Sequence, residues 1–409
     1  MLSFTAGCRV GAGRPRAVGV LGLLGVTGLL AVGCGSSGAR VAAPSGAAPV
    51  AYAPWPTAES DATHTSQAAV VGPQAGTVKW RAQIGPTSEG PSIGSDGTIY
   101  EASDAGVLHA INPGTGRDQW TFDGHGPIGG DLSTTAAVLP DKTIVWPGSR
   151  HTVFGLSPQG QRLWSVDVGG VPLSPAVQSS TDVYVMTGSG SLDAIRVTGG
   201  KAVIRWALRL GKSSFGSPVI RHDGVIETTV DDSLVAVKDE GGKAKEAWRF
   251  TVGKQVEVSP AVSSDGTTVL GTDDGSEYGV NAAGKQVWKH AINIFSYSSP
   301  AVTQNGTTYY GDNSGLLTVA NAATGAVTRT LSADPGSAKP GNIWTSPAID
   351  SKGDVYYGTN DGHVYGWSAG GTRLFTVTTG KTVSSYPALS AQGDLLIGSD
   401  DGNLYDIGG

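Results

Sequence analysis

Residues 248–288 read WRFTVGKQVEVSPAVSSDGTTVLGTDDGSEYGVNAAGKQVW, and this stretch decides the fold. It runs from one tryptophan-bearing segment to the next, with three further strand-like segments between them. The segment 259–262 (SPAV) opens a short apolar strand, and the pairs Asp265-Gly266 and Asp274-Gly275 follow at turn positions. Asp-Gly pairs favour tight hairpins because both residues tolerate positive φ. The stretch therefore predicts four short antiparallel strands, of which the last carries the tryptophan.

The same order of features recurs along the chain every 40 to 44 residues. The repeated aromatic or large apolar position is occupied in turn by Trp80, Trp120, Trp164, Trp206, Trp248, Trp288, Leu331 and Phe375. A proline opens the small apolar strand in phase with this position, at Pro91, Pro175, Pro218, Pro260, Pro300, Pro347 and Pro387. The unit around residues 134–164 lacks the Ser-Pro pair but keeps its strands. Four strands in a period of about 42 residues match the blade of a β-propeller and not a pair of helices.

The two ends of the repeat array are complementary. The array begins with an aromatic strand at residues 78–84 and stops after a third strand at residues 403–407, so the last unit lacks its own fourth strand. We therefore predict an all-β fold for residues 77–409. It is an eight-bladed β-propeller of four-stranded antiparallel blades, in which the N-terminal strand completes the last blade and closes the ring.

The N-terminal region has the features of an export signal. Arg9, Arg14 and Arg16 precede an apolar run at residues 17–32, and small residues lead to Cys34, an order that resembles the bacterial lipobox. We predict a lipoprotein signal peptide at residues 1–33 and lipidation of Cys34. Residues 34–76 are rich in Gly, Ser, Ala and Pro and are expected to be a flexible tether. The domain is then extracytoplasmic, on the outer face of the cytoplasmic membrane or on an outer membrane if the host has one.

Charge and cysteine content narrow the range of functions. The formal net charge is −6, and removal of residues 1–33 would take away three arginines and leave −9, which argues against nucleic acid as a partner. Cys8 and Cys34 are the only cysteines, so the mature domain has no disulfide and no cysteine nucleophile. The seven histidines show no metal-ligand spacing, and no metal site is predicted. We expect a monomeric propeller that meets the membrane through its lipid alone.

The phased order Trp-x4-Gly, Ser-Pro-Ala-Val, Asp-Gly-Thr and Gly-x-Leu/Val-Tyr resembles the repeat of the quinoprotein-type (PQQ-like) β-propeller family. The resemblance covers residues 78–409. That family includes quinone-dependent alcohol dehydrogenases and noncatalytic lipoproteins of the BamB type, which assist outer-membrane barrel assembly. One fold with several activities means that the site must decide the function.

The resemblance implies specific features for an enzyme of this family: a vicinal disulfide, calcium-binding carboxylates and amides, and long insertions between blades. The mature chain has no cysteine pair and no long insertion. Paired aspartates occur at Asp231-Asp232, Asp273-Asp274 and Asp400-Asp401, but all three pairs fall at the same hairpin of different blades, where Asp is a turn residue. We predict no catalytic residue and no cofactor. A PQQ-binding quinoprotein or degenerate dehydrogenase is the alternative.

The loops between each aromatic strand and the next Ser-Pro strand are expected to surround one mouth of the central channel. Basic and aromatic residues predicted for this binding mouth are Lys212, Phe215, Lys254, Tyr297, Trp344, Lys381 and Tyr386. Such groups could bind an anionic or planar ligand or anchor a protein. Alternatively, each side chain covers the end of its own blade. The repeat tryptophans Trp80, Trp120, Trp164, Trp206, Trp248 and Trp288 are expected to fill the wedges between blades. The sequence thus predicts a noncatalytic protein-interaction or ligand-binding scaffold whose partners are envelope proteins or peptides.

Overall fold

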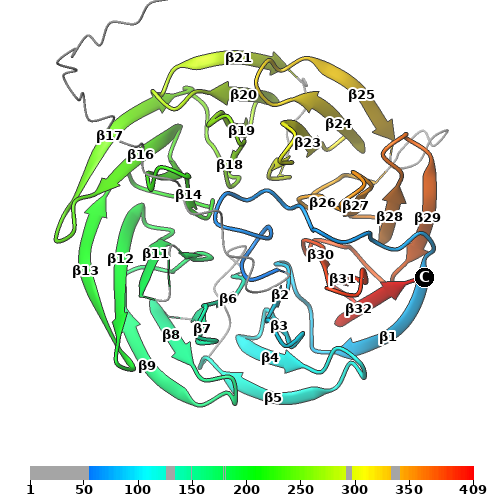
Figure 1. The fold of residues 1–409 in the computed structure, drawn as a ribbon, viewed down its shortest axis with the longest axis horizontal. Coiled ribbons are helices and arrows are strands. Elements are labelled where there is room, and N and C mark those ends of the chain that lie inside the picture. Colours follow the sequence, from blue (N-terminus) through cyan, green and yellow to red (C-terminus); the bar gives the residue numbers. More distant parts are fainter. Residues whose placement is uncertain are drawn as a thin grey trace, which may run out of the picture. The chain divides into compact units, whose positions relative to one another are not determined.

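The structure is a computed structural model that describes residues 55–125, 134–148, 150–177, 179, 181–291, 297–332 and 341–409. All of these residues belong to one compact unit, Gly46–Gly409. The predicted signal peptide and Cys34 lie outside the described residues. The unit is a ring of eight four-stranded antiparallel sheets, which confirms the predicted eight-bladed propeller (Figure 1).

The strands follow one another blade by blade. Blade 1 consists of β2 (Ser92–Ile93), β3 (Ile99–Ala102), β4 (Val107–Ile111) and β5 (Asp118–Asp123), and blade 2 of β6 (Ala137–Val138), β7 (Ile144–Pro147), β8 (Thr152–Leu156) and β9 (Arg162–Asp167). Blade 3 consists of β10 (Ala176–Val177), β11 (Asp182–Met186), β12 (Ser191–Thr198) and β13 (Lys201–Arg209), and blade 4 of β14 (Val219–Ile220), β15 (Ile226–Val230), β16 (Ser233–Asp239) and β17 (Ala244–Thr251). Blade 5 consists of β18 (Ala261–Val262), β19 (Thr268–Thr272), β20 (Ser276–Val280) and β21 (Gln286–Ala291), and blade 6 of β22 (Ala301–Val302), β23 (Thr307–Gly311), β24 (Leu316–Asn321) and β25 (Val327–Ser332). Blade 7 consists of β26 (Ala348–Ile349), β27 (Val355–Gly358), β28 (His363–Trp367) and β29 (Arg373–Thr378), and blade 8 of β30 (Ala388–Leu389), β31 (Leu395–Gly398), β32 (Asn403–Gly408) and β1 (Thr77–Gln83).

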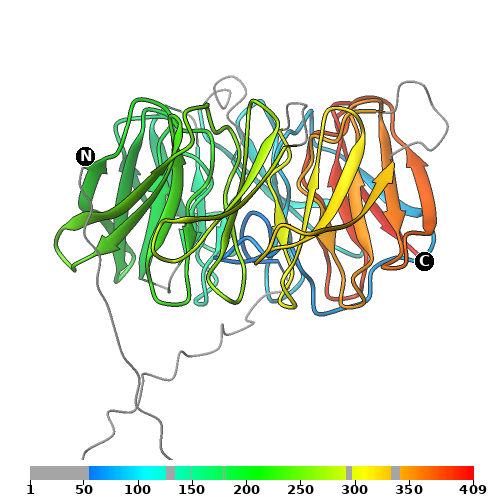
Figure 2. The ribbon, with the colours of Figure 1, turned by 90° about the horizontal axis from the view of Figure 1, so that it is seen from above.

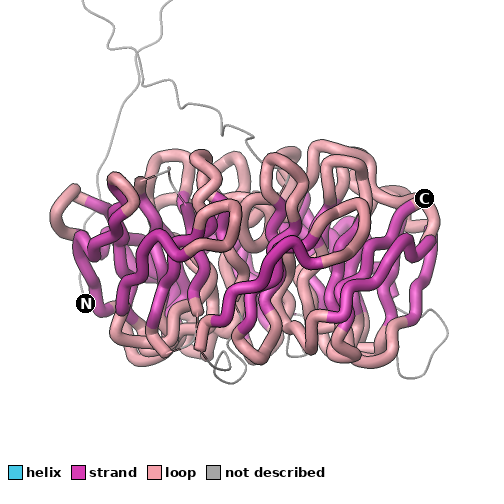
Figure 3. The backbone as a smooth tube through the Cα atoms, turned by 90° about the horizontal axis from the view of Figure 1, so that it is seen from below, coloured by secondary structure: helices cyan, strands magenta, loops and turns pink. Residues whose placement is uncertain are grey.

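Burial changes from the inner to the outer strand of each blade. In blade 5, every residue of β18, β19 and β20 is buried, whereas β21 is mostly exposed. Inner strands are covered on both faces by neighbouring blades, which explains their short, continuous apolar runs. The strands lie between two layers of turns and loops (Figure 3). No helix in the described part of the chain is long and apolar enough to cross a membrane.

Ring closure is the feature that joins the two ends of the propeller. Strand β1 pairs antiparallel with β32 from Thr77↔Gly408 to Gln83↔Asn403, so blade 8 contains the first and the last strand of the described chain. Beyond the strand, the backbone N–H of Ile84 donates to the Gly402 carbonyl at 3.0 Å. The predicted closure is confirmed, and no blade is left with an unpaired edge at the junction.

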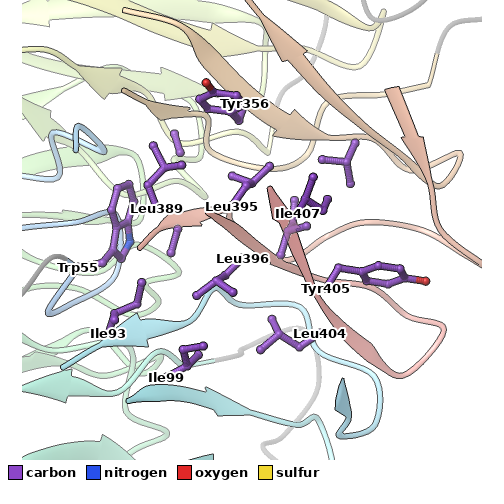
Figure 4. Packing of buried hydrophobic residues seen from close by; sticks show 14 of the residues in the cluster. Trp55, Ile93, Ile99, Tyr356, Leu389, Leu395, Leu396, Leu404, Tyr405 and Ile407 are labelled. Carbon is purple, nitrogen blue, oxygen red and sulfur yellow. The ribbon is translucent and has the colours of Figure 1, made fainter. Parts of the chain in front are cut away.

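The prediction of a flexible tether is wrong for residues 55–76. Residues 55–68, which we call the axial segment, run through the centre of the ring (Figure 1) and are mostly buried. Trp55 is 2 % exposed and packs with Ile93 and Leu389 (Figure 4). Residues 69–76 then cross the turns of blades 7 and 8, where Ser351 donates its N–H to the Val70 carbonyl at 2.9 Å. Of the predicted tether, only residues 34–54 lie outside the described part of the chain.

The repeat tryptophans connect neighbouring blades. The indole N–H of Trp80 in blade 8 donates to the Pro113 carbonyl of blade 1 at 2.8 Å, and Trp248 in blade 4 donates to Ala282 of blade 5 at 3.1 Å. Equivalent bonds join Trp120 to Pro158 and Trp288 to Ala322, while Trp164 and Trp206 are 7 % exposed. Each of these four hydrogen-bonded rings thus lies over the outer hairpin of the next blade.

The strand register in blade 6 shows that the repeat position was assigned to the wrong residue in the sequence. Leu331 pairs with Leu317, whereas the residue that directly follows the β-bulge of the outer strand, as Trp288 does in blade 5, is Arg329, opposite Val319. The two positions differ by two residues and share a face of the strand. The apolar pattern therefore identified Leu331 as the repeat position, whereas Arg329 is the residue equivalent to the tryptophans.

Candidate functional site

The predicted mouth residues lie in five successive loops, each of which joins the outer strand of one blade to the inner strand of the next. We call these connections the interblade loops. Lys212 and Phe215 lie between β13 and β14, and Lys254 lies between β17 and β18. Tyr297, Trp344 and the pair Lys381 and Tyr386 lie in the next three loops in turn. The interblade loops are on the face opposite residues 69–76, which run along the other edge of the ring (Figure 2).

The rim of this face carries exposed cations and aromatic rings. Phe215 is 40 % exposed and Tyr297 41 %, and Lys212, Lys254 and Lys381 are exposed. Large exposed apolar side chains, aromatic rings above all, are typical of protein contact surfaces. These five residues have the accessibility that a docking surface requires.

Aspartates of the hairpins support the backbone of these loops. Asp231 has a φ of 52° and accepts hydrogen bonds from the backbone N–H groups of Lys212 and Ser213, at 3.1 and 3.0 Å. Burial alone would raise the pKa of Asp231, but these N–H donors lower it below its ordinary value. Asp401 likewise accepts the N–H of Gly380 at 2.8 Å. These two aspartates, one from each of two predicted pairs, therefore act as loop supports.

Tyr297 and Trp344 are the two predicted aromatic residues that the structure brings together. Their rings meet edge to face, with centroids 6.0 Å apart and planes at 87°. The Trp344 indole N–H donates to Asn313 Oδ1 at 2.8 Å, which fixes the ring at the rim of blade 6. Edge-to-face pairs add about 1 kcal/mol beyond area burial, so this pair is a rigid feature of the face.

Tyr386 differs from the other predicted residues because its phenol points inward. Burial raises the pKa of Tyr386 well above 10, and the nearby carboxylates of Glu89 and Glu59 add to the effect. The hydroxyl also interacts with Ser299 and Ser346 of blades 6 and 7. Tyr386 is therefore part of the inner ring and not of the rim.

The inner ring is a feature that the sequence analysis did not assign. The residue that precedes the inner-strand proline is Ser174, Ser217, Ser259, Ser299 or Ser346 in blades 3 to 7, and Thr135 holds the equivalent position in blade 2, where Ala136 replaces the proline. Backbone N–H groups donate to the hydroxyl of the next blade, from Thr135 to Ser174 at 2.8 Å and from Ser259 to Ser299 at 3.0 Å. The recurring Ser-Pro pair was visible in the sequence, and its hydroxyl links adjacent blades around the axis.

The axial segment adds an ion pair to this centre. His64 Nδ1 lies 2.7 Å from Glu59 Oε2, and both side chains are at most 3 % exposed. Ser346 Oγ donates to Glu59 Oε1 at 2.9 Å, and His64 Nδ1 lies 3.1 Å from the Pro260 carbonyl. Burial alone would lower the pKa of His64, but the Glu59 carboxylate outweighs it and the pKa is raised. The pair fastens the segment to blades 5 and 7.

A quinone cofactor can be tested against these residues. Pyrroloquinoline quinone carries three carboxylates, so its site needs cations and hydrogen-bond donors. Glu59 and Glu89 are carboxylates near the axis, and Glu89 Oε2 accepts hydrogen bonds from Thr135 and Ser174 at 3.1 and 3.2 Å. His64 is engaged by Glu59. Like charges repel strongly where water is excluded, so these residues do not fit the cofactor.

In the residues that the structure describes, no group of three or more His, Cys, Asp or Glu side chains is arranged to hold a metal ion.

Comparison with known proteins assigns the family. Residues 64–212 and 204–407 match the family described as "Outer membrane protein assembly factor BamB". The chain belongs to this BamB-like β-propeller family. The two matched ranges together take in all eight blades, and they begin inside the axial segment at His64.

Individual BamB-like relatives are distant. The chain is 28 % identical over 108 residues to the outer membrane protein assembly factor BamB of Nitrosomonas eutropha, and this match covers 26 % of the chain and 25 % of the relative. The match thus spans about a quarter of the length of that curated relative.

Solved structures of two kinds share the fold. BamB from Moraxella catarrhalis has a TM-score of 0.61 at 15 % identity, over 81 % of this chain and 99 % of that one. Quinohemoprotein alcohol dehydrogenase from Comamonas testosteroni has a TM-score of 0.69 at 12 % identity, over 86 % of this chain and 80 % of that one. At these identities the similarities establish the propeller and not its activity.

Proposed function

We propose that this protein is a noncatalytic, lipid-anchored scaffold of the cell envelope and that its interblade loops bind a protein partner. The observation that carries the proposal is the arrangement of the two faces. The axial segment occupies the centre, and residues 69–76 cross the turns of blades 7 and 8 on one face. The opposite face presents Phe215, Tyr297 and the three rim lysines.

The chemistry of the rim favours a protein over a small molecule. The exposed rings and the lysines are distributed over four of the five loops. Spread aromatic anchors surrounded by charges are typical of protein interfaces, where a few rings supply most of the binding free energy. The partner class is therefore an envelope protein that carries an apolar patch with acidic groups at its edge.

The family membership supports an envelope role. In a host with an outer membrane, the family description favours participation in the assembly of outer-membrane proteins. The lipobox-like order before Cys34 supports attachment by a lipid, with residues 35–54 as the tether. Metabolic labelling with a radioactive fatty acid should label the wild-type chain and not a Cys34→Ser variant. An unlabelled wild-type chain, or equal labelling of both, would contradict the anchor.

Site-specific photocrosslinking in the native envelope tests the docking face. A photoreactive residue replaces Phe215 or Tyr297, and the matched control replaces Val203, which is 59 % exposed on the outer strand β13. We expect one discrete envelope protein to be captured from positions 215 and 297 and not from position 203. Equal capture from all three positions, or no discrete adduct from the interblade loops, would refute the proposed face.

A further inference from the structure

A cavity of about 620 Å³ lies where the first and last blades meet, and we call it the junction cavity. It opens among the turns of the face that residues 69–76 cross, on the other side of the ring from the interblade loops. Its walls come from β1, β32, the turn at residues 94–97 and the turn at residues 390–394. The cavity is therefore built by ring closure and is separate from the proposed docking face.

Asp406 is the unusual residue of this cavity. It pairs across the strands with Trp80 on one side and Leu396 on the other, and all three side chains line the cavity. In the other blades that carry an aromatic ring at this position, the residue opposite the ring is Ala110, Gly155, Ala194, Ala236, Gly279 or Gly366. Blade 8 thus places a carboxylate where six other blades have no functional group.

The Asp406 carboxylate is not satisfied by the protein. The residue is 3 % exposed, and its buried Oδ1 accepts no hydrogen bond. A buried acceptor without a partner is unfavourable, so a neighbouring donor would be strongly favoured. Burial, together with the charge of Asp394, raises the pKa of Asp406 to about 7, even though Lys79 acts in the opposite direction. The one cation of the lining, Lys79, pairs with Asp394 at 2.5 Å.

The rest of the lining selects for a particular type of ligand. Asp96, Asp394 and Asp406 outnumber Lys79, so the cavity has an excess of negative charge. Trp80, Ile99 and Leu396 provide an apolar wall. A cation beside an indole and a desolvated carboxylate gains both a cation–π contact and a charge-assisted hydrogen bond.

We propose that the junction cavity binds an alkylammonium group, with the Asp406 carboxylate as its acceptor and the Trp80 ring along its aliphatic stem. A lysine side chain of another protein and a free aliphatic amine share this chemistry. The open position of the cavity among turns gives access to both.

Titration followed by NMR tests this site. The Trp80 indole N–H, which donates to the Pro113 carbonyl at 2.8 Å, is the reporter, and a Trp80→Phe variant assigns its resonance. The probes are N-acetyl-lysine methylamide, putrescine and the neutral N-acetyl-norleucine methylamide. We expect saturable shifts with the two amines only. Tighter binding of the capped lysine would identify a protein side chain as the source, and tighter binding of putrescine would identify a free amine.

Two variants determine whether Asp406 is the acceptor. Asp406→Ala introduces the residue that blades 1, 3 and 4 already hold here, so the fold should tolerate it, and Asp406→Asn keeps the shape. Both should weaken amine binding by about tenfold or more, since the charge-assisted bond is lost. Glu240→Gln, the same charge change on an exposed hairpin, should leave binding unaltered. Norleucine binding equal to lysine, no shift of Trp80, or unaltered binding by both Asp406 variants would overturn the proposal.

Discussion

Replacement of Glu277 by leucine should stabilise the protein in a pH-dependent manner. Glu277 lies in β20, is fully buried, and neither carboxylate oxygen has a hydrogen-bond partner. Leu234 and Leu317 occupy the same register position in blades 4 and 6. The wedge around Glu277 is therefore built for an aliphatic side chain.

The size of the effect follows from proton linkage. Burial raises the pKa of Glu277 from its ordinary 4.5 to about 8. The folded state then holds the proton more tightly than the unfolded chain, so the contribution of Glu277 to stability is full below pH 4.5 and declines as the pH rises towards 8. The decline is about 1.4 kcal/mol per pH unit, or about 3 kcal/mol at pH 7. Glu277→Leu removes this loss.

Urea unfolding at several pH values between 5 and 8 measures the prediction. The free energy of unfolding of Glu277→Leu minus that of the wild type should increase steadily with pH, and Glu277→Gln should show the same slope with a smaller offset. The exposed Glu240→Gln is the control and should parallel the wild type. Parallel curves for the wild type and both Glu277 variants would refute the reasoning.

Three further predictions concern the ring itself. Deletion of Asn403–Gly409 removes the partner of β1 and should abolish the cooperative thermal transition, whereas an unchanged melting temperature would contradict closure. Trp55→Ala should lower the free energy of unfolding by about 3 to 5 kcal/mol in denaturant titrations, and a surface-like change below about 0.5 kcal/mol would exclude a core role. Gly284→Ala places a methyl group 2.5 Å from the Trp248 ring, whereas Gly306→Ala, at a similar φ of 78°, meets nothing within 4 Å. The first should destabilise by about 1 to 3 kcal/mol more than the second, and equal costs would show that the ring contact is unimportant.

The fold could be predicted because its signals are local. Seven of the eight blades have a proline before the inner strand, and four have an Asp-Gly or Asn-Gly turn after it. These residues determine the backbone within a few positions of themselves. The number of blades and the closure of the ring could be predicted from the regular spacing of these motifs along the chain. The error at Leu331 has the same origin, since Arg329 and Leu331 share a face and only the register across β24 separates them.

The site was predicted only in part because its key contacts are not local. Topology alone assigns the seven mouth residues to interblade loops, and five of them are exposed there. The inward direction of Tyr386 depends on serines of two other blades. The pairing of Glu59 with Ser346 joins residues 287 positions apart, which no pattern within a repeat reveals.

The axial segment shows why composition was misleading at the domain boundary. Inner strands are sheet edges, and their backbone N–H groups need acceptors once they are buried. Carbonyls of residues 55–68 accept these N–H groups in blades 1, 2, 4, 5 and 7, at 2.6 to 2.9 Å. Because the segment accepts these five hydrogen bonds at irregular intervals, its sequence needs no periodic pattern. Small, flexible residues allow its backbone to turn from one blade to the next. It therefore has the composition of a linker while completing the hydrogen bonding of the ring. A chain that begins at residue 77 would expose those five edges and should be less stable and more prone to aggregate than one that begins before Trp55.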